Sequence, residues 1–290
     1  MRRREFIRLL GCAAAWPLTA RAQDQGRSYR LGCLLPTEDG SPAWLAFLDE
    51  LRLNGFIKDQ NLTIIPGGLD VRRDQVDAKV ASLVRTEPDA IVSGPDHYTH
   101  AVQQVTKSIP IIGMSEDMVL EGFVASLSRP GGNTTGISLL SPELDGKRQD
   151  LLIEAVPGIR RIATLLDGTR TGQEHVKKLR SAAAARGIDV DVFSVDTSDQ
   201  ALSAIDAAKA SGAKAINFLA TPLFTIGAQP LLARVVELQM PAMHQWPEMA
   251  EEGGLIGYGP RFTGVFRQRA RLVARVLRGE KPASAESPAG

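Results

Sequence analysis

Short apolar runs alternate with helix-forming stretches along most of this chain of 290 residues. Residues 31–35 form the first run. Trp44, Phe47 and Leu51 follow it, and their spacing of three and four places them on one face of a helix. Strands that alternate with helices at this spacing indicate parallel βαβ units. The sequence therefore predicts an α/β protein.

The alternation occurs twice, once in each half of the chain. In the first half we expect strands at 31–35, 62–65, 90–92, 110–114 and 123–127. In the second half we expect them at 162–166, 190–193, 215–219 and 241–243. Turn-rich residues 129–136 lie between the halves, and residues 255–260 are expected to form a return crossing. This pattern predicts two doubly wound Rossmann-like lobes joined by a multi-crossover hinge.

These crossings set the expected domain limits. The first lobe is predicted to comprise 28–136 plus 261–280, the second 137–260, and residues 281–290 a disordered Pro/Ala/Ser tail. The last helix, over 263–278, carries several arginines that are expected on its solvated face. They are Arg267, Arg269, Arg271, Arg275 and Arg278.

Residues 1–22 have the three parts of a secretory signal. They begin with MRRREFIR, continue with about a dozen apolar or small residues, and end in the small-x-small triplet Ala20-Arg21-Ala22. The apolar part is too short to span a bilayer of about 30 Å. Arg3-Arg4 matches the twin-arginine export pattern, with an ordinary secretion signal as the alternative. We therefore predict export to the periplasm without stable membrane insertion.

Charge and cysteine content narrow the function further. The whole chain has a net charge of +1. Residues 1–22 hold five arginines and one glutamate, a net charge of +4, so residues 23–290 have a net charge of −3. A mildly acidic protein has no general electrostatic attraction for nucleic acid. Cys12 lies in the signal, so Cys33 is expected to be an unpaired core residue.

Motifs for catalysis are absent from the sequence. It contains no Walker loop, no G-x-S-x-G elbow and no H-E-x-x-H helix. His97 and His100, beside Asp96, are conceivable metal ligands, but no further ligand follows at a usual spacing. We therefore predict neither an enzyme nor a cofactor.

Small polar and aromatic residues follow the predicted strands, at the sheet edges where α/β proteins bind ligands. In the first lobe the candidate ligand residues are Thr37, Glu38, Asp39, Ser41, Gly94, Asp96, His97, Tyr98, Ser115 and Asp117. In the second lobe they are Asp167, Thr169, Thr221, Phe224, His244 and Trp246. Such a mixture suits a partly apolar zwitterion or ring compound. For each of these residues, capping a helix or forming a turn is the alternative role.

Three segments carry a family resemblance. Residues 125–136 read ASLSRPGGNTTG, residues 140–148 read LSPELDGKR, and residues 252–260 read EGGLIGYGP. Together they resemble the substrate-binding proteins of one ABC importer family. The resemblance implies a type I periplasmic-binding fold and a monomer that delivers a small ligand to a permease with its ATPase.

The resemblance also bears on the ligand. Related members bind aromatic amino acids, which makes an aromatic or other amino acid the expected ligand. Asp167-Gly168-Thr169-Arg170 stands where the family has an Asn-Pro turn. The family also continues beyond the last helix, so we expect the first lobe to lack an edge element and to be less stable. The alternatives are a ligand sensor for a membrane signalling protein and a secreted α/β enzyme.

Overall fold

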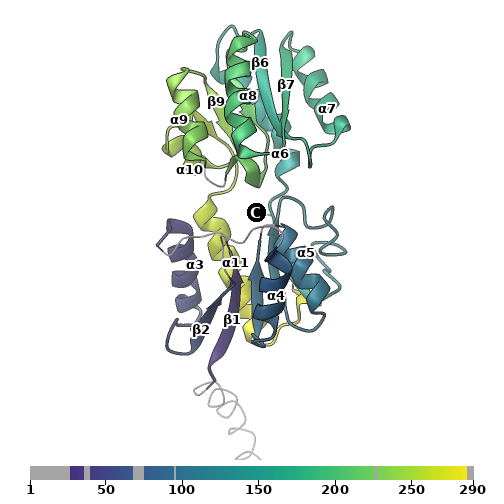
Figure 1. Cartoon of the computed structure of the whole chain (residues 1–290), viewed down its shortest axis with the longest axis vertical. Helices are drawn as coiled ribbons and strands as arrows, with labels where there is room; N and C mark the ends of the chain where they lie inside the picture. The colour runs from purple at the N-terminus through teal and green to yellow at the C-terminus, as the bar shows by residue number, and fades with distance from the viewer. Residues whose placement is uncertain (1–26, 36–39, 68–74, 95, 226–227, 286–290) are drawn as a thin grey trace, which may run out of the picture.

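The computed structural model describes residues 27–35, 40–67, 75–94, 96–225 and 228–285. The predicted signal over 1–22 and the candidates Thr37, Glu38 and Asp39 lie outside these residues. Figure 1 shows two α/β lobes placed one above the other. Within the described ranges, no helix combines the length and apolar character that a membrane span requires.

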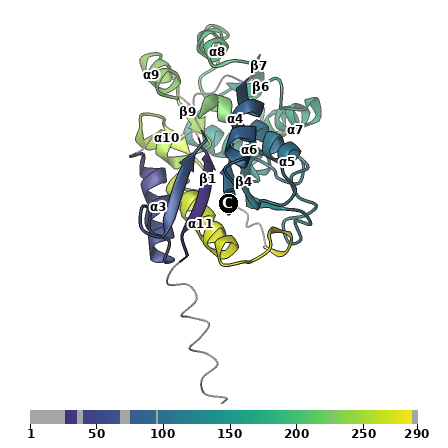
Figure 2. The same cartoon turned by 60° about the horizontal axis from the view of Figure 1, so that its bottom comes forward.

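The first lobe contains a parallel five-stranded sheet in the order β2-β1-β3-β4-β5. Its strands are β1 (Tyr29–Leu34), β2 (Leu62–Pro66), β3 (Ala90–Ser93), β4 (Ile111–Ser115) and β5 (Thr134–Ser138). Its helices are α3 (Pro42–Leu53), α4 (Val76–Val84), α5 (Asp96–Val105) and α11 (Phe262–Leu277). One face of the sheet packs on α3 and α11, and the other packs on α4 and α5 (Figures 1 and 2).

The second lobe contains a parallel sheet in the order β10-β9-β8-β6-β7. Its strands are β6 (Arg161–Asp167), β7 (Asp189–Val195), β8 (Ile216–Phe218), β9 (Ala242–His244) and β10 (Ile256–Gly257). Its helices are α6 (Ser141–Ala155), α7 (Gln173–Ala184), α8 (Ser198–Ala210), α9 (Gln229–Glu237) and α10 (Pro247–Glu251), with a 3₁₀ turn η2 (Pro222–Phe224). Two parallel sheets with interleaved helices confirm the predicted fold class.

The chain passes between the lobes after β5 and again after β10. Figure 1 shows α11 beginning between the lobes and running along the first one. The return crossing is more regular than expected, because Ile256 and Gly257 form β10 beside β9. The exact lobe limits inferred from the sequence stay a prediction.

The strand predicted at 123–127 is wrong. Gly122 has a φ of 73°, and the following residues form bends and irregular backbone. Phe123 and Val124 pack beside Met118 in a small separate cluster. Phe123 and Val124 are therefore apolar because they pack in this cluster, and they do not form a strand.

The fifth strand lies instead in the segment predicted to cross between the lobes. It is Thr134–Ser138, and it pairs along β4. A Cβ at Gly136 would meet the backbone of Gly113 at 2.2 Å, so this close approach requires glycine. Gly136, which suggested a turn, therefore permits tight strand packing.

The tail predicted to be disordered is ordered over its first residues. Pro282–Ser284 form the 3₁₀ turn η3, and Ala285 is fully buried. The hydroxyl of Thr135 donates to the carbonyl oxygen of Ala285 at 2.8 Å. This contact with β5 corrects the prediction as far as Ala285, and residues 286–290 lie outside the described part.

Candidate functional site

An ion-pair cluster joins the two lobes at the carboxyl ends of their strands. Arg170, in the loop after β6, donates from Nη2 to Asp96 and, at 2.9 Å, to Glu121. Asp96 is the first residue of α5, which follows β3. Partial burial opposes protonation of Arg170, but the hydrogen bond and charge of Asp96 outweigh it and raise the pKa of the guanidinium. Arg170 therefore stays cationic between two carboxylates of the opposite lobe.

A second contact joins the lobes beside this cluster. The amide Nε2 of Gln245 donates to both carboxylate oxygens of Glu116, at 2.9 and 3.2 Å. Gln245 follows β9 and Glu116 follows β4. The carboxyl ends of the two sheets thus face each other, which is where open α/β sheets bind their ligands.

Arg148, on α6, is fully buried near this junction. Its Nη1 donates to Asp145 at 3.0 Å, and its Nε donates to the carbonyl oxygen of Tyr258 at 2.7 Å. The other oxygen of Asp145 lies 3.0 Å from His175 Nε2. Burial lowers the pKa of Arg148, and the nearby charge of Asp145 opposes that shift. Arg148 therefore connects α6, which follows the first crossing, to Tyr258 in the return crossing.

Three predicted residues of the second lobe come together. Asp167 accepts hydrogen bonds from the Thr169 backbone nitrogen at 2.9 Å and from its hydroxyl at 2.6 Å. The other carboxylate oxygen accepts from the hydroxyl of Thr221 at 3.0 Å. These contacts set the shape of the strand-end loop that carries Arg170.

Several predicted residues of the first lobe shape turns at the strand ends. Ser41 caps α3 by accepting from the Trp44 backbone nitrogen at 3.2 Å. Asp117 accepts from two backbone nitrogens of its own turn, and its nitrogen donates to Ser115 Oγ at 3.3 Å. Gly94 directly follows β3 and is buried, and the half-buried ring of His97 lies 4.5 Å from that of Tyr98.

Four predicted ligand residues lie within hydrophobic packing. Tyr98 belongs to the cluster between α4, α5 and the first sheet, and Phe224 packs edge-on against Phe218. His244 stacks on the same Phe218, and burial lowers its pKa to about 4. Trp246 meets Phe262, the first residue of α11, at a ring distance of 4.8 Å. An aromatic side chain near the end of a strand is equally compatible with a cleft and with the core. In the structure, these four side chains pack in the core.

Sequence reasoning did not select the polar and charged residues that join the lobes. Glu116, Arg170 and Gln245 follow predicted strands but were not chosen as ligand candidates, and Arg148 and Glu121 were not considered. Asp145 and Arg148, three residues apart on a predicted helix, gave a detectable signal. The pairs that join the two lobes connect residues far apart in the sequence, and no sequence pattern indicates them.

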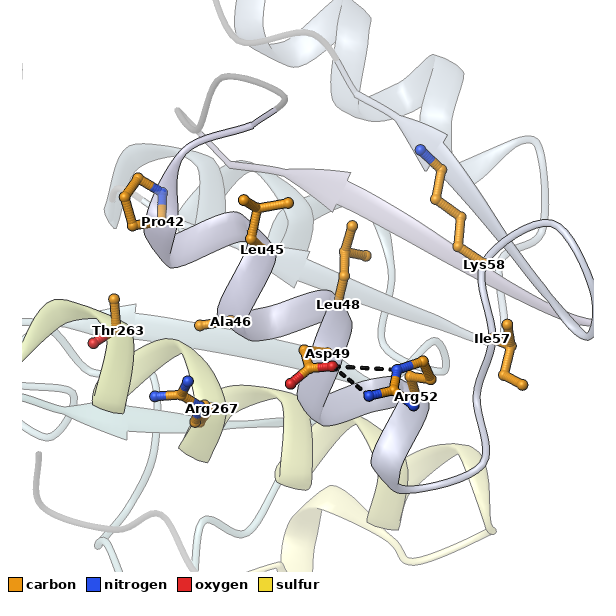
Figure 3. Close-up of a pocket in the computed structure, with 10 residues that line it drawn as sticks. All are labelled: Pro42, Leu45, Ala46, Leu48, Asp49, Arg52, Ile57, Lys58, Thr263 and Arg267. Carbon is orange, nitrogen blue, oxygen red and sulfur yellow. Dashed lines mark hydrogen bonds and ion pairs between the residues drawn. The ribbon is translucent and has the colours of Figure 1, made fainter.

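A separate groove of about 740 Å³ lies on the first lobe. It is lined by α3, α11 and residues 57–58, including Leu45, Leu48 and Arg267 (Figure 3). None of the predicted ligand residues lines it. Over the described ranges, no cluster of His, Cys, Asp and Glu side chains could hold a metal ion.

Comparisons with known proteins support the fold and show the family. The family model described as "ABC transporter substrate binding protein" matches residues 71–288. No curated protein matches the chain.

Solved structures are similar over most of the chain. A conserved domain protein from Vibrio cholerae has a TM-score of 0.78 and 21% identity, covering 92% of this chain and 90% of that one. An ABC domain from Streptococcus pneumonia, in complex with L-Trp, has a TM-score of 0.77 and 20% identity over 91% and 89%. An open, ligand-free substrate-binding protein with adhesive properties from Clostridium difficile has a TM-score of 0.66 and 19% identity over 90% and 89%. At these identities the likeness shows the fold.

Proposed function

Because the chain belongs to the ABC transporter substrate-binding protein family, we propose that it is the exported receptor of an importer and binds an amino acid between its lobes. The ligand would lie where the strand ends of the two sheets face each other. Binding and release need no chemical step, so no catalytic group is required.

The observation that carries this proposal is the charge difference between the two facing edges. The first lobe presents Asp96, Glu116 and Glu121, whereas the second presents Arg170 and the amide of Gln245. A zwitterion offers an ammonium to carboxylates and a carboxylate to cationic or amide donors. An α-amino acid therefore complements both edges at once.

The similar solved structures support a small ligand, which could be an amino acid or a polyol. The streptococcal structure holds L-Trp, and a solute-binding protein from Agrobacterium vitis holds allitol. A polyol carries no charge and offers no charge complementary to the ionic groups of this cleft. The charged edges favour the amino acid, and the half-buried Met114 could contact an apolar side chain.

The same contacts suggest how ligand binding would be read. A ligand that bridges both edges favours the closed arrangement of the lobes by the difference between its affinities for the closed and open forms. The crossings after β5 and β10 would act as the hinge, with Arg148 holding them in register. A permease could then distinguish loaded from empty protein.

A ligand screen tests the proposal. The purified protein is heated with each of the twenty L-amino acids, with sugars and polyols, and with aromatic acids, and hits are confirmed by calorimetry. An amino acid should raise the melting temperature by mass action. A response only to neutral sugars or polyols, or conversion of a hit into product, would refute the proposal.

Uptake separates an importer receptor from a sensor. Cells with and without the gene are given the radiolabelled hit. Loss of uptake without the gene supports transport, whereas unchanged uptake with a lost transcriptional response to the hit points to sensing.

A further inference from the structure

A second fully buried arginine, Arg269, lies beneath the first lobe's half of the junction. It belongs to α11, and the solvated position that the sequence predicted for it is wrong, since it is 0% exposed. Its Nη2 donates to the carbonyl oxygen of Ser93, the last residue of β3, and to that of Ile112 at 3.1 Å. Among the described residues, its Nε and Nη1 have no hydrogen-bond partner.

No anionic side chain of the described residues compensates this charge. Burial lowers the pKa of Arg269 to about 9, which still leaves it protonated at pH 7. The neighbouring Cys33 is neutral at that pH, because burial raises the pKa of its thiol to about 12. A buried cation without an anion is strongly unfavourable, and proteins normally pair such a group. Arg269 is therefore a cation that lacks an anion among the residues that the structure describes.

Gly94 connects this cation with the strand-end edge. A Cβ at Gly94 would lie 3.7 Å from Arg269 Nη2 and 3.6 Å from the carbonyl oxygen of Met114. Gly94 directly follows β3, and Asp96, two residues later, pairs with Arg170 across the junction. A ligand group that contacts Gly94 would thus approach the guanidinium with no side chain of Gly94 itself in between.

We propose that Arg269 makes the cleft selective for ligands that carry a carboxylate, which would lie over Gly94 and face Arg170 of the opposite lobe. This deepens the proposed function, because it rests on a ligand bound at the strand ends. In surroundings of low dielectric, a charge acts strongly on another several ångströms away, even without direct contact. Asp96 and Glu116, which contact Arg170 and Gln245 across the junction, would face the ammonium group of the same ligand.

Two variants test the proposal by calorimetry. Each is measured with the best amino acid of the screen and with its carboxamide, in which the negative charge is removed. Arg269→Met should weaken amino-acid binding by about tenfold or more and carboxamide binding by less than about threefold. Arg269→Lys, which keeps the charge, should retain much of the discrimination.

Gly94→Ala is a third variant, and it keeps the charge of Arg269 while filling the space beside the guanidinium. The added methyl would make ordinary contacts, so the melting temperature should stay unchanged while amino-acid affinity falls about tenfold. Gly132→Ala is the matched control, because a Cβ there meets nothing within 4 Å, and it should leave affinity unchanged.

The outcomes distinguish this proposal from the function it rests on. Equal losses for amino acid and carboxamide, or no loss in either, would overturn the role of Arg269 and leave an amino-acid receptor intact. A large stability loss in Arg269→Met with unchanged discrimination would show that the chain itself supplies the anion. If wild-type protein binds another carboxylic acid but no amino acid, and Arg269→Met weakens it, the proposed function fails and Arg269's role stands. Ligands that are all neutral would overturn both.

Discussion

Arg148 and Arg269 are both fully buried, one in each lobe, yet their surroundings differ. Arg148 has Asp145 at 3.0 Å and a backbone carbonyl at 2.7 Å. Arg269 has only backbone carbonyls within hydrogen-bond reach and no carboxylate among the described residues. The first is neutralised by its own lobe and holds a crossing in place. The second keeps its charge, which makes it useful for a ligand and of little use for stability.

Removing the carboxylate beside Arg148 should have the largest effect. Asp145→Asn would remove the carboxylate that is hydrogen-bonded to the buried Arg148, which costs about 3–5 kcal/mol of unfolding free energy. Urea denaturation followed by circular dichroism measures the loss. Asp150→Asn is the control, because Asp150 pairs with Arg186 at the surface and should cost no more than about 1 kcal/mol. Equal losses in the two variants would remove the contrast on which this comparison depends.

His244 extends the comparison to a buried group that can lose its proton. Neither ring nitrogen has a partner among the described residues, and burial lowers the pKa from 6.5 to about 4. Because the folded pKa lies below the unfolded one, the contribution is fully present above pH 6.5 and is lost as the pH falls towards 4. The loss should reach about 3 kcal/mol.

Unfolding free energies at pH 7, 5.5 and 4 check this expectation. His244→Phe keeps an aromatic ring against Phe218 and should flatten the dependence over that window. An equally steep fall in the variant would assign the acid sensitivity to other groups.

The strands of the first half show what the sequence could predict. The apolar runs at 31–35, 62–65, 90–92 and 110–114 became β1 to β4, because continuous apolar residues of this length fit a sheet covered on both faces. The fifth strand was misplaced, because Thr134 and Gly136 read as a turn while Phe123 reads as a strand. Only the contact of Gly136 with Gly113 shows that glycine belongs in this strand.

The arginines of α11 show what the sequence could not predict. Arg267 and Arg271 are exposed as expected, whereas Arg269 is buried because its two acceptors come from β3 and β4, more than a hundred residues earlier. Periodicity along one helix cannot reveal such a partner. The same limit hid the pairs that Arg170 and Gln245 form with the opposite lobe.

Arg170 differs from both Arg148 and Arg269, because it is partly exposed and pairs with carboxylates of the opposite lobe. Arg170→Gln should weaken binding of an amino acid about tenfold and change stability by no more than about 1 kcal/mol. Calorimetry and urea denaturation measure the two effects. Arg180→Gln, at an exposed position on α7, is the matched control and should change neither. An unchanged affinity in Arg170→Gln would mean that the ligand carboxylate is held by the first lobe alone.

Arg269→Met should have the smallest effect on stability, in spite of complete burial. Replacing a buried charge with an apolar side chain of similar length removes the desolvation cost together with only two hydrogen bonds to carbonyl oxygens. The unfolding free energy should therefore change by less than about 1 kcal/mol or increase. Urea denaturation of Arg269→Met beside Asp145→Asn tests both arginines under one set of conditions. A loss as large as that of Asp145→Asn would show that Arg269 is held by its own lobe in the way Arg148 is, and the distinction between a neutralised and an available cation would no longer hold.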